Sequence, residues 1–187
     1  MQVTFTRTGE RRYSVAVDRG DGSILHMPAG PGYDPCLPHD LVHFVVERHF
    51  AIAGGVYGQL AAGGTAGTFF TIPHRRRDPS RRLSHRLGAL GREDMARSER
   101  LTAVYMAAWH ARHGGRWEFA DAVGADQAAG VTEALLVELD GVANRWHALQ
   151  VGSALTLTWP AHLTLRPGNS ASGRRRSRER GVPTRRR

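Results

Sequence analysis

Apolar and polar residues alternate in the N-terminal part of the chain. Residues 3–6 and 13–17 place an apolar side chain at every second position, which is the period of a strand with one buried face. Residues 8–10 contain a glycine between these two segments and predict a hairpin turn. A second glycine-containing turn at residues 20–22 leads to a shorter apolar segment at residues 24–27. We therefore predict a three-stranded antiparallel meander.

Three longer segments have the period of helices. Residues 38–52 begin with a proline, which suits the first turn of a helix, and carry a broad arc of apolar side chains. Residues 93–113 and 127–149 repeat large apolar side chains every three or four positions. The arginine-rich residues 74–86 are interpreted as a solvated loop or the frayed start of the helix that follows. Alternation returns at residues 154–159, which predicts one further strand.

Together these elements predict an α+β fold in a single globular domain, residues 1–165. The N-terminal meander should pack against the three main helices, and the strand at residues 154–159 should return to the sheet. Residues 166–187 hold nine arginines and almost no large apolar side chain. We expect this segment to form a disordered basic tail, because it has too little apolar surface to bury.

Glycines interrupt the segment that follows the first helix. Residues 53–58 and 62–67 are approximate copies of each other, and each copy contains three glycines. We predict a short helix at residues 56–61 between the glycine turns and a strand at residues 68–72. Glycine-rich turns can bind phosphate through backbone N–H groups, but neither copy has the spacing of a Walker or Rossmann motif. The pattern therefore favours tight turns and close packing.

The candidate chemistry lies on the helix of residues 38–52. His39, His43 and Glu47 recur every four residues and form one row along the helix, with Asp40 beside them. Two histidines one turn apart can bind the same metal ion. The row contains no arginine, although arginine is the most frequent charged residue in the chain. The spacing indicates a site for zinc or iron with His39, His43 and Glu47 as its candidate ligands.

Residues 39–43, His-Asp-Leu-Val-His, are similar to the His-Glu-x-x-His motif of zinc metalloproteases. Asp40 stands at the position of the general base and is the candidate catalytic residue, although its side chain is one methylene shorter than that of glutamate. A third protein ligand is required, and the candidates are Glu47, Cys36, His110, His113 and His147. The alternative is that His39 and Asp40 cap the helix and that the rest of the row faces solvent.

Cys36 is the only cysteine, so no disulfide can form within the chain. Its place just before a helix and near His39 could lower the pKa of a thiol nucleophile. The sequence identifies no orienting residue and no oxyanion hole to accompany such a nucleophile. We therefore interpret Cys36 as a small buried or loop residue.

The net charge of +9 is distributed unevenly along the chain. The tail contributes +8, so residues 1–165 are nearly neutral. Two arginine-rich segments could bind nucleic-acid phosphates without sequence preference, and their candidate residues are Arg75, Arg76, Arg77, Arg174, Arg175 and Arg176. Every cation is arginine and none is lysine. Together with the abundance of alanine and glycine, this composition is typical of a GC-rich bacterial genome.

The sequence contains no clear export or membrane signal. Residues 1–12 lack the apolar core of a signal peptide. Residues 50–73 carry no charge, but six glycines and few large aliphatic side chains make insertion into a bilayer unfavourable. We expect a cytoplasmic protein that does not associate with membranes.

Two adjoining segments resemble bacterial proteins that are described only as hypothetical. They are residues 37–47, Leu-Pro-His-Asp-Leu-Val-His-Phe-Val-Val-Glu, and residues 54–64, Gly-Gly-Val-Tyr-Gly-Gln-Leu-Ala-Ala-Gly-Gly. The resemblance is confined to residues 1–70. It implies no activity.

Two functions from different classes follow from these observations. A metal-binding protein requires the two imidazoles to converge on a third ligand, and a metal-dependent hydrolase also requires an open coordination position. A non-catalytic binding or accessory protein requires no such convergence. It could associate with nucleic acid through its arginine-rich segments.

Removal of residues 170–187 should leave thermal stability unchanged, because the segment buries no apolar surface. Non-specific affinity for DNA should fall, and its salt dependence should become shallower, because most of the excess positive charge is removed. Thermal unfolding and DNA titrations at several salt concentrations measure both effects. Tight, sequence-dependent binding by the truncated protein would contradict the prediction and place the recognition surface in the folded body, first at residues 75–86.

Overall fold

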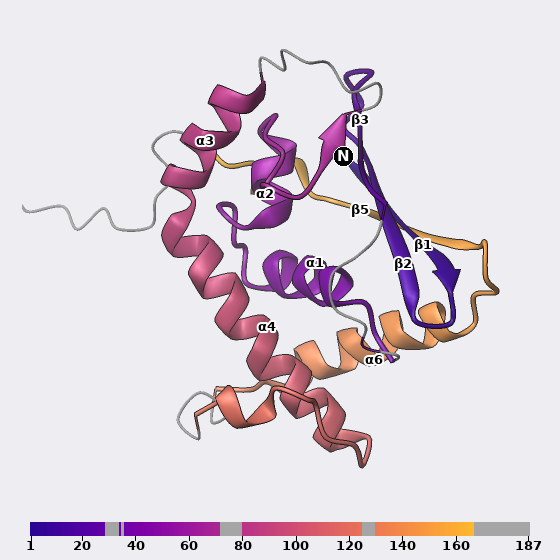
Figure 1. The fold of residues 1–187 in the computed structure, drawn as a ribbon. Helices are drawn as coiled ribbons and strands as arrows, with labels where there is room; N and C mark the ends of the chain where they lie inside the picture. Colours follow the sequence, from indigo (N-terminus) through magenta and orange to yellow (C-terminus); the bar gives the residue numbers. More distant parts are fainter. Residues whose placement is uncertain (29–33, 35, 72–79, 125–129, 167–187) are drawn as a thin grey trace, which may run out of the picture.

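A computed structural model of the chain describes residues 1–28, 34, 36–71, 80–124 and 130–166. The fold is α+β, as the sequence periodicity predicts (Figure 1). The strands are β1 (Gln2–Gly9), β2 (Arg12–Asp18), β3 (Ile24–Met27), β4 (Phe70–Thr71) and β5 (Ala154–Thr158). The helices are α1 (His39–His49), α2 (Val56–Ala61), α3 (Ser80–Leu90), α4 (Arg92–Arg112) and α6 (Glu133–His147), with 3₁₀ turns η1 (Ala120–Ala122) and η2 (Ala161–Leu163).

The strands form one antiparallel sheet in the order β4-β3-β2-β1-β5. The predicted meander supplies the three strands β1, β2 and β3. Thr4 of β1 pairs with Ala16 of β2 on one side and with Thr156 of β5 on the other. The hydroxyls of Thr4 and Thr156 are 2.9 Å apart. The C-terminal strand therefore returns to the sheet beside the N-terminal strand, as the sequence predicts.

The sheet has one apolar face, which is covered by the helices. Val3 and Phe5 of β1 and Leu155 and Leu157 of β5 are at most 7% exposed. The side chains at the alternate positions of these strands are partly or fully exposed. Figure 1 shows the helices on one side of the sheet. The strict alternation in the sequence thus reflects a two-layer architecture with its core between sheet and helices.

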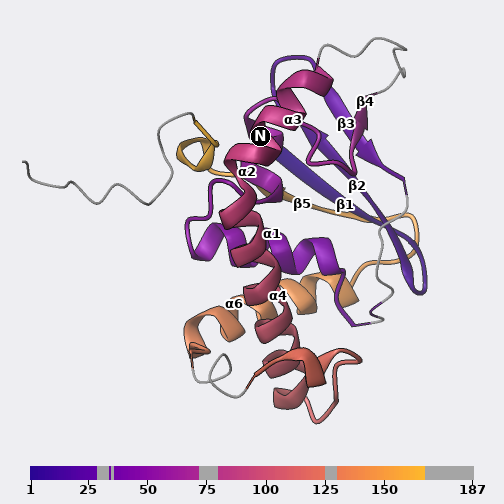
Figure 2. The ribbon, with the colours of Figure 1, turned by 60° about the vertical axis from the view of Figure 1, so that its left-hand side comes forward.

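α1 lies at the centre of the helical layer and contacts α2, α4 and α6 (Figures 1 and 2). Phe44, in the middle of α1, is fully buried. The centroid of its ring lies 6.2 Å from that of Phe5, 5.0 Å from that of Tyr57 and 5.4 Å from that of Trp159. These rings come from β1, α2 and the residue after β5. A single aromatic side chain of α1 therefore joins elements that are far apart in the sequence, with edge-to-face contacts that favour aromatic packing.

The sequence pattern did not predict α3 as a helix of its own. We expected a solvated loop or the frayed start of the following helix at residues 74–86, but the part that the structure describes belongs to α3, a separate helix that precedes α4. Leu87 is 4% exposed and lies so close to Gly64 that a Cβ on this glycine would approach it to 2.9 Å. Among the described side chains of α3 only Leu87 is buried, Leu83 and Ser84 are half-buried, and the arginines are exposed. A narrow stripe in an arginine-rich segment gives a weak helical pattern, which explains the difference.

The first glycine copy provides close packing, as the sequence predicts. A Cβ at Gly58 would lie 1.9 Å from the carbonyl oxygen of Ala53 and 2.9 Å from that of Leu163. A Cβ at Gly91, between α3 and α4, would lie 2.3 Å from the carbonyl oxygen of Gly54. Only glycine allows these backbone segments to approach one another so closely.

The arginines proposed to bind nucleic acid lie outside the part of the chain that the structure describes; they are Arg75, Arg76, Arg77, Arg174, Arg175 and Arg176. The same holds for residues 167–187 of the predicted tail. Among the helices of the described ranges, none has the length and apolar character needed to cross a bilayer.

Gly58→Ala should destabilise the fold by about 2 kcal/mol or more, because the new methyl group would overlap backbone atoms that cannot move independently. Gly141→Ala is the matched control. Gly141 also lies within a helix, α6, but a Cβ there meets no atom within 4 Å. This variant should be more stable than the wild type by about 0.5–1 kcal/mol, because alanine has the higher helix propensity. Denaturant unfolding measures both, and equal stabilities of the two variants would contradict the packing of α2.

Candidate metal centre

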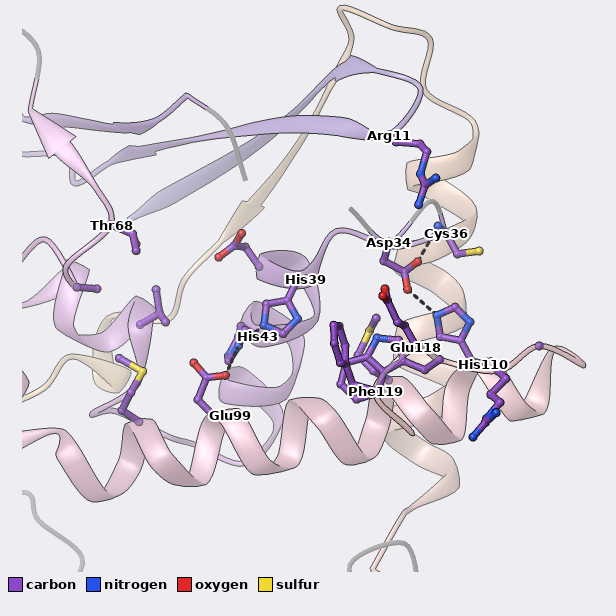
Figure 3. A pocket seen from close by; sticks show the side chains of 18 residues that line it. Arg11, Asp34, Cys36, His39, His43, Thr68, Glu99, His110, Glu118 and Phe119 are labelled. Atoms are coloured by element: carbon purple, nitrogen blue, oxygen red, sulfur yellow. Dashed lines mark hydrogen bonds and ion pairs between the residues drawn. The ribbon is translucent and has the colours of Figure 1, made fainter. Parts of the chain in front are cut away.

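Two histidines and one glutamate converge between α1 and α4. His39 and His43 lie one turn apart on α1, and their Nε2 atoms are 3.0 Å apart. The carboxylate of Glu99, on α4, lies 3.4 Å from Nε2 of His43. One ligand atom from each of the three side chains lies within 4.8 Å of the other two. Figure 3 shows the three groups pointing toward one another, so their donor atoms can meet at a single ion.

Hydrogen bonds on the far side of the imidazole orient His43. Its Nδ1 lies 2.8 Å from the hydroxyl of Ser98, and this hydroxyl donates to Oε1 of Glu47 at 2.7 Å. Because the Ser98 hydroxyl has a single hydrogen and gives it to Glu47, Nδ1 of His43 is the donor in the other bond. The hydroxyl of Thr102 lies 3.2 Å from the same nitrogen. Nε2 is therefore the nitrogen of His43 that can ligate a metal ion.

Glu47 points away from this convergence point. The side chain is fully buried, and its two carboxylate oxygens accept the backbone N–H groups of Val56 and Tyr57 at 2.8 and 3.0 Å. Gly55 makes this approach possible, because a Cβ there would lie 2.3 Å from the carboxyl carbon of Glu47. The sequence suggested Glu47 as a metal ligand. In the structure it binds the amino end of α2 and supports His43 through a serine hydroxyl.

The cluster favours one positive charge between its members. Burial lowers the pKa of His43, but the carboxylates of Glu47 and Glu99 outweigh burial and raise this pKa to about 9. Burial and the neighbouring His43 lower the pKa of His39 to about 4. The hydrogen bond with His43 lowers the pKa of Glu99. The proton on Nε2 of His43 is thus held between a neutral imidazole and a carboxylate, and a divalent cation that replaced this proton would meet the same acceptors.

Asp40 lies beside the cluster but is bound to the sheet. Its Oδ2 accepts a hydrogen bond from the hydroxyl of Tyr13, on β2, and its backbone carbonyl accepts one from Tyr57 at 2.7 Å. The residue is 8% exposed, and burial raises the pKa of its carboxyl group although Tyr13 opposes this shift. Asp40 lines the same cavity as His39 and His43. Its role as a general base stays a prediction.

A cavity of about 1010 Å³ opens onto the cluster. His39, His43 and Glu99 lie in the middle part of its lining, with Thr68 on one side of them and Asp34 and His110 on the other (Figure 3). Nε2 of His110 lies 2.7 Å from the Asp34 carboxylate, which ties α4 to the segment before α1. Much of the remaining lining is apolar and consists of Val56, Ala66, Met95, Met106, Trp117 and Phe119. The volume is typical of cavities that bind small molecules.

The other residues considered as a third ligand are engaged elsewhere. Nε2 of His113 lies 2.8 Å from the Asp140 carboxylate. A ring nitrogen of His147 is hydrogen-bonded to the backbone carbonyl of Cys36. Burial and, next, the carboxylate of Asp34 raise the pKa of the Cys36 thiol, which is the opposite of the shift that activates a nucleophile. These surroundings agree with the interpretation of Cys36 as a structural residue in a loop.

Sequence spacing did not identify Glu99, because it lies on a different helix from the two histidines. One signal was present nearby. Ser98 and Thr102, both fully buried, interrupt the apolar face of α4 one turn apart. Small hydroxyl side chains on a buried helix face indicate a polar partner on the neighbouring element. That partner is His43, and Glu99 follows Ser98 directly.

Comparisons of the chain with models of protein families, with curated proteins and with solved structures found no match. The geometry of the cluster and its cavity therefore has to indicate the function.

Glu47→Ala should destabilise the protein by about 3 kcal/mol or more, because three donors, two of them buried, lose their acceptor. These donors are the N–H groups of Val56 and Tyr57 and the hydroxyl of Ser98. Glu138→Ala is the control, since Glu138 also accepts from α1 but its side chain is 39% exposed. Its loss should cost about 1 kcal/mol or less. Denaturant unfolding measures the difference, and similar costs for both variants would show that Glu47 has no special structural role.

Proposed function

We propose that this protein binds zinc or iron through His39, His43 and Glu99 and hydrolyses a small molecule held in the adjoining cavity. The observation that carries the proposal is the convergence of three donor atoms within 4.8 Å in the lining of a cavity of about 1010 Å³. Two imidazoles and one carboxylate are the ligand set of a class of catalytic zinc sites. The same set holds iron(II) in non-haem oxygenases, so the ligands alone are compatible with either metal.

The number of protein donors favours a catalytic site over a structural one. Structural zinc sites are closed by four protein ligands, whereas catalytic sites keep a position for water or substrate. The cluster offers three donors, and the Glu99 side chain is 58% exposed toward the cavity side. A metal ion at this place would lower the pKa of a bound water molecule. Asp40, whose carboxylate is oriented by Tyr13 in the same cavity, is the candidate base.

The purified protein should contain about one zinc or iron ion per chain, and Glu99→Ala should lose most of it because one of three protein ligands is removed. Because the Glu99 side chain is 58% exposed, this variant should stay folded. His43→Ala should also lose the metal. Elemental analysis after dialysis against a weak chelator, with circular dichroism as a check of folding, measures the effect.

Glu93→Ala is the matched control, since Glu93 is an exposed glutamate on the same helix and lies outside the cluster. This variant should retain the metal content of the wild type. A folded wild-type protein that neither contains nor takes up zinc or iron would contradict the proposal. A non-catalytic binding or accessory protein would then be the better description.

A further inference from the structure

A second cavity meets the candidate metal centre from the side of α3. It has a volume of about 620 Å³ and is lined by residues of α3 and of the first half of α4, so we name it the α3–α4 cavity. Ala66, Met95 and Glu99 line both this cavity and the larger one. Glu99 therefore stands where the two cavities meet. A ligand bound at the metal centre could extend into both.

Basic residues outnumber acidic ones in the described lining of the α3–α4 cavity. Arg81 and His85 lie one turn apart on α3, and Arg92 begins α4. Glu99 is the one acidic residue among the described side chains of this lining. The hydroxyl of Ser84 accepts the backbone N–H of Thr65 at 3.0 Å, which holds the loop on the opposite wall against α3.

A metal ion on Glu99 would change the balance of charge in this cavity. The ion would neutralise the single acidic lining residue and leave the guanidinium groups of Arg81 and Arg92. Guanidinium groups bind carboxylates and phosphates with paired hydrogen bonds. The α3–α4 cavity thus has the chemistry of a site for a compact oxyanion.

Beyond the cluster, the larger cavity has more aromatic surface and charges of both signs. Met106, Trp117 and Phe119 contribute apolar and aromatic surface to its lining, whereas Arg11 and Arg116 are accompanied there by the acidic residues Asp34 and Glu118. Surfaces of this kind bind apolar groups and rings, because water is released from both partners. One molecule could therefore place a charged group in the α3–α4 cavity and an apolar group in the larger cavity, with the metal centre between the two groups.

We infer that the ligand of the metal centre is an organic oxyanion with an apolar body. Its carboxylate or phosphate group would be bound by Arg81 and Arg92, and its apolar body would lie near Trp117 and Phe119. This inference rests on the proposed function. The substrate class is an ester or amide that joins the two parts. In its hydrolysis the oxygen of water adds to the carbonyl carbon, the bond to the leaving oxygen or nitrogen breaks, and that leaving atom takes a proton.

Three probes test the inference on the zinc-loaded full-length protein by isothermal titration calorimetry. Benzoylglycine carries a carboxylate head and a ring joined by an amide, phenyl phosphate carries a phosphate head, and N-methylbenzamide has no charge. The variant Arg81→Gln/Arg92→Gln should bind the better of the two anions at least about tenfold more weakly than the wild type. Its affinity for N-methylbenzamide and its zinc content should be unchanged.

Arg97→Gln/Arg100→Gln is the matched control. It removes the same charge, partly from the same helix, but Arg97 and Arg100 line a separate cavity of about 350 Å³ beside Phe50. Its affinity for the anions should stay within about twofold of the wild type, because distant surface charges are screened by salt. The ratio of the two anion affinities then tells which head group the site prefers.

Three results would overturn the inference: no binding of either anion by the wild type, no loss in Arg81→Gln/Arg92→Gln, or an equal loss in both double variants. A wild type that takes up no zinc contradicts the proposed function alone, because the same titrations can be made on the metal-free protein. A selective loss of anion affinity in Arg81→Gln/Arg92→Gln would still support an oxyanion site in the α3–α4 cavity.

Discussion

The buried carboxylate of Glu47 joins the three helices on which the candidate site is built. It belongs to α1, accepts two backbone N–H groups at the amino end of α2, and accepts the hydroxyl of Ser98 on α4. A carboxylate removed from water is tolerated only when donors surround it, since an unpaired buried charge costs several kcal/mol. Ser98 donates its hydrogen to Glu47 and accepts the Nδ1–H of His43, so Glu47 also fixes the orientation of the His43 ring. The stability of the helical layer and the orientation of one candidate ligand therefore depend on the same group.

The three candidate ligands differ in how firmly the fold holds them. His43 is 2% exposed and bound on its far side, whereas the side chain of Glu99 is 58% exposed. The imidazole of His43 is thus the most firmly held of the three groups, and the carboxylate of Glu99 is the one that solvent and ligand can reach most easily. Glu99 also stands at the meeting point of the two cavities. A metal ion bound to Glu99 would therefore be close to ligands in either cavity.

Local sequence determined most of the elements and two of the three residues of the cluster. The alternation in residues 3–6, 13–17 and 154–159 predicts β1, β2 and β5 correctly, because the burial of a half-buried strand follows its own period of two. α1 begins at His39, one residue after the proline that marks its start. His39 and His43 meet as expected, because four residues make about one turn of any α-helix. The glycines of residues 53–58 correctly predicted close packing, although the sequence does not show which segments they contact.

The tertiary structure decided which carboxylate faces the two imidazoles. Spacing favours Glu47, which lies in the same row as His43. In the structure, however, both carboxylate oxygens of Glu47 accept backbone N–H groups at the amino end of α2, and the side chain points away from the cluster. Glu99 comes from α4, and α1 packs against that helix, so that His43 and Glu47 are buried and do not face solvent. Spacing within one helix sets the direction of its side chains. The distance between α1 and α4 depends on the packing of the whole core, which no local pattern contains.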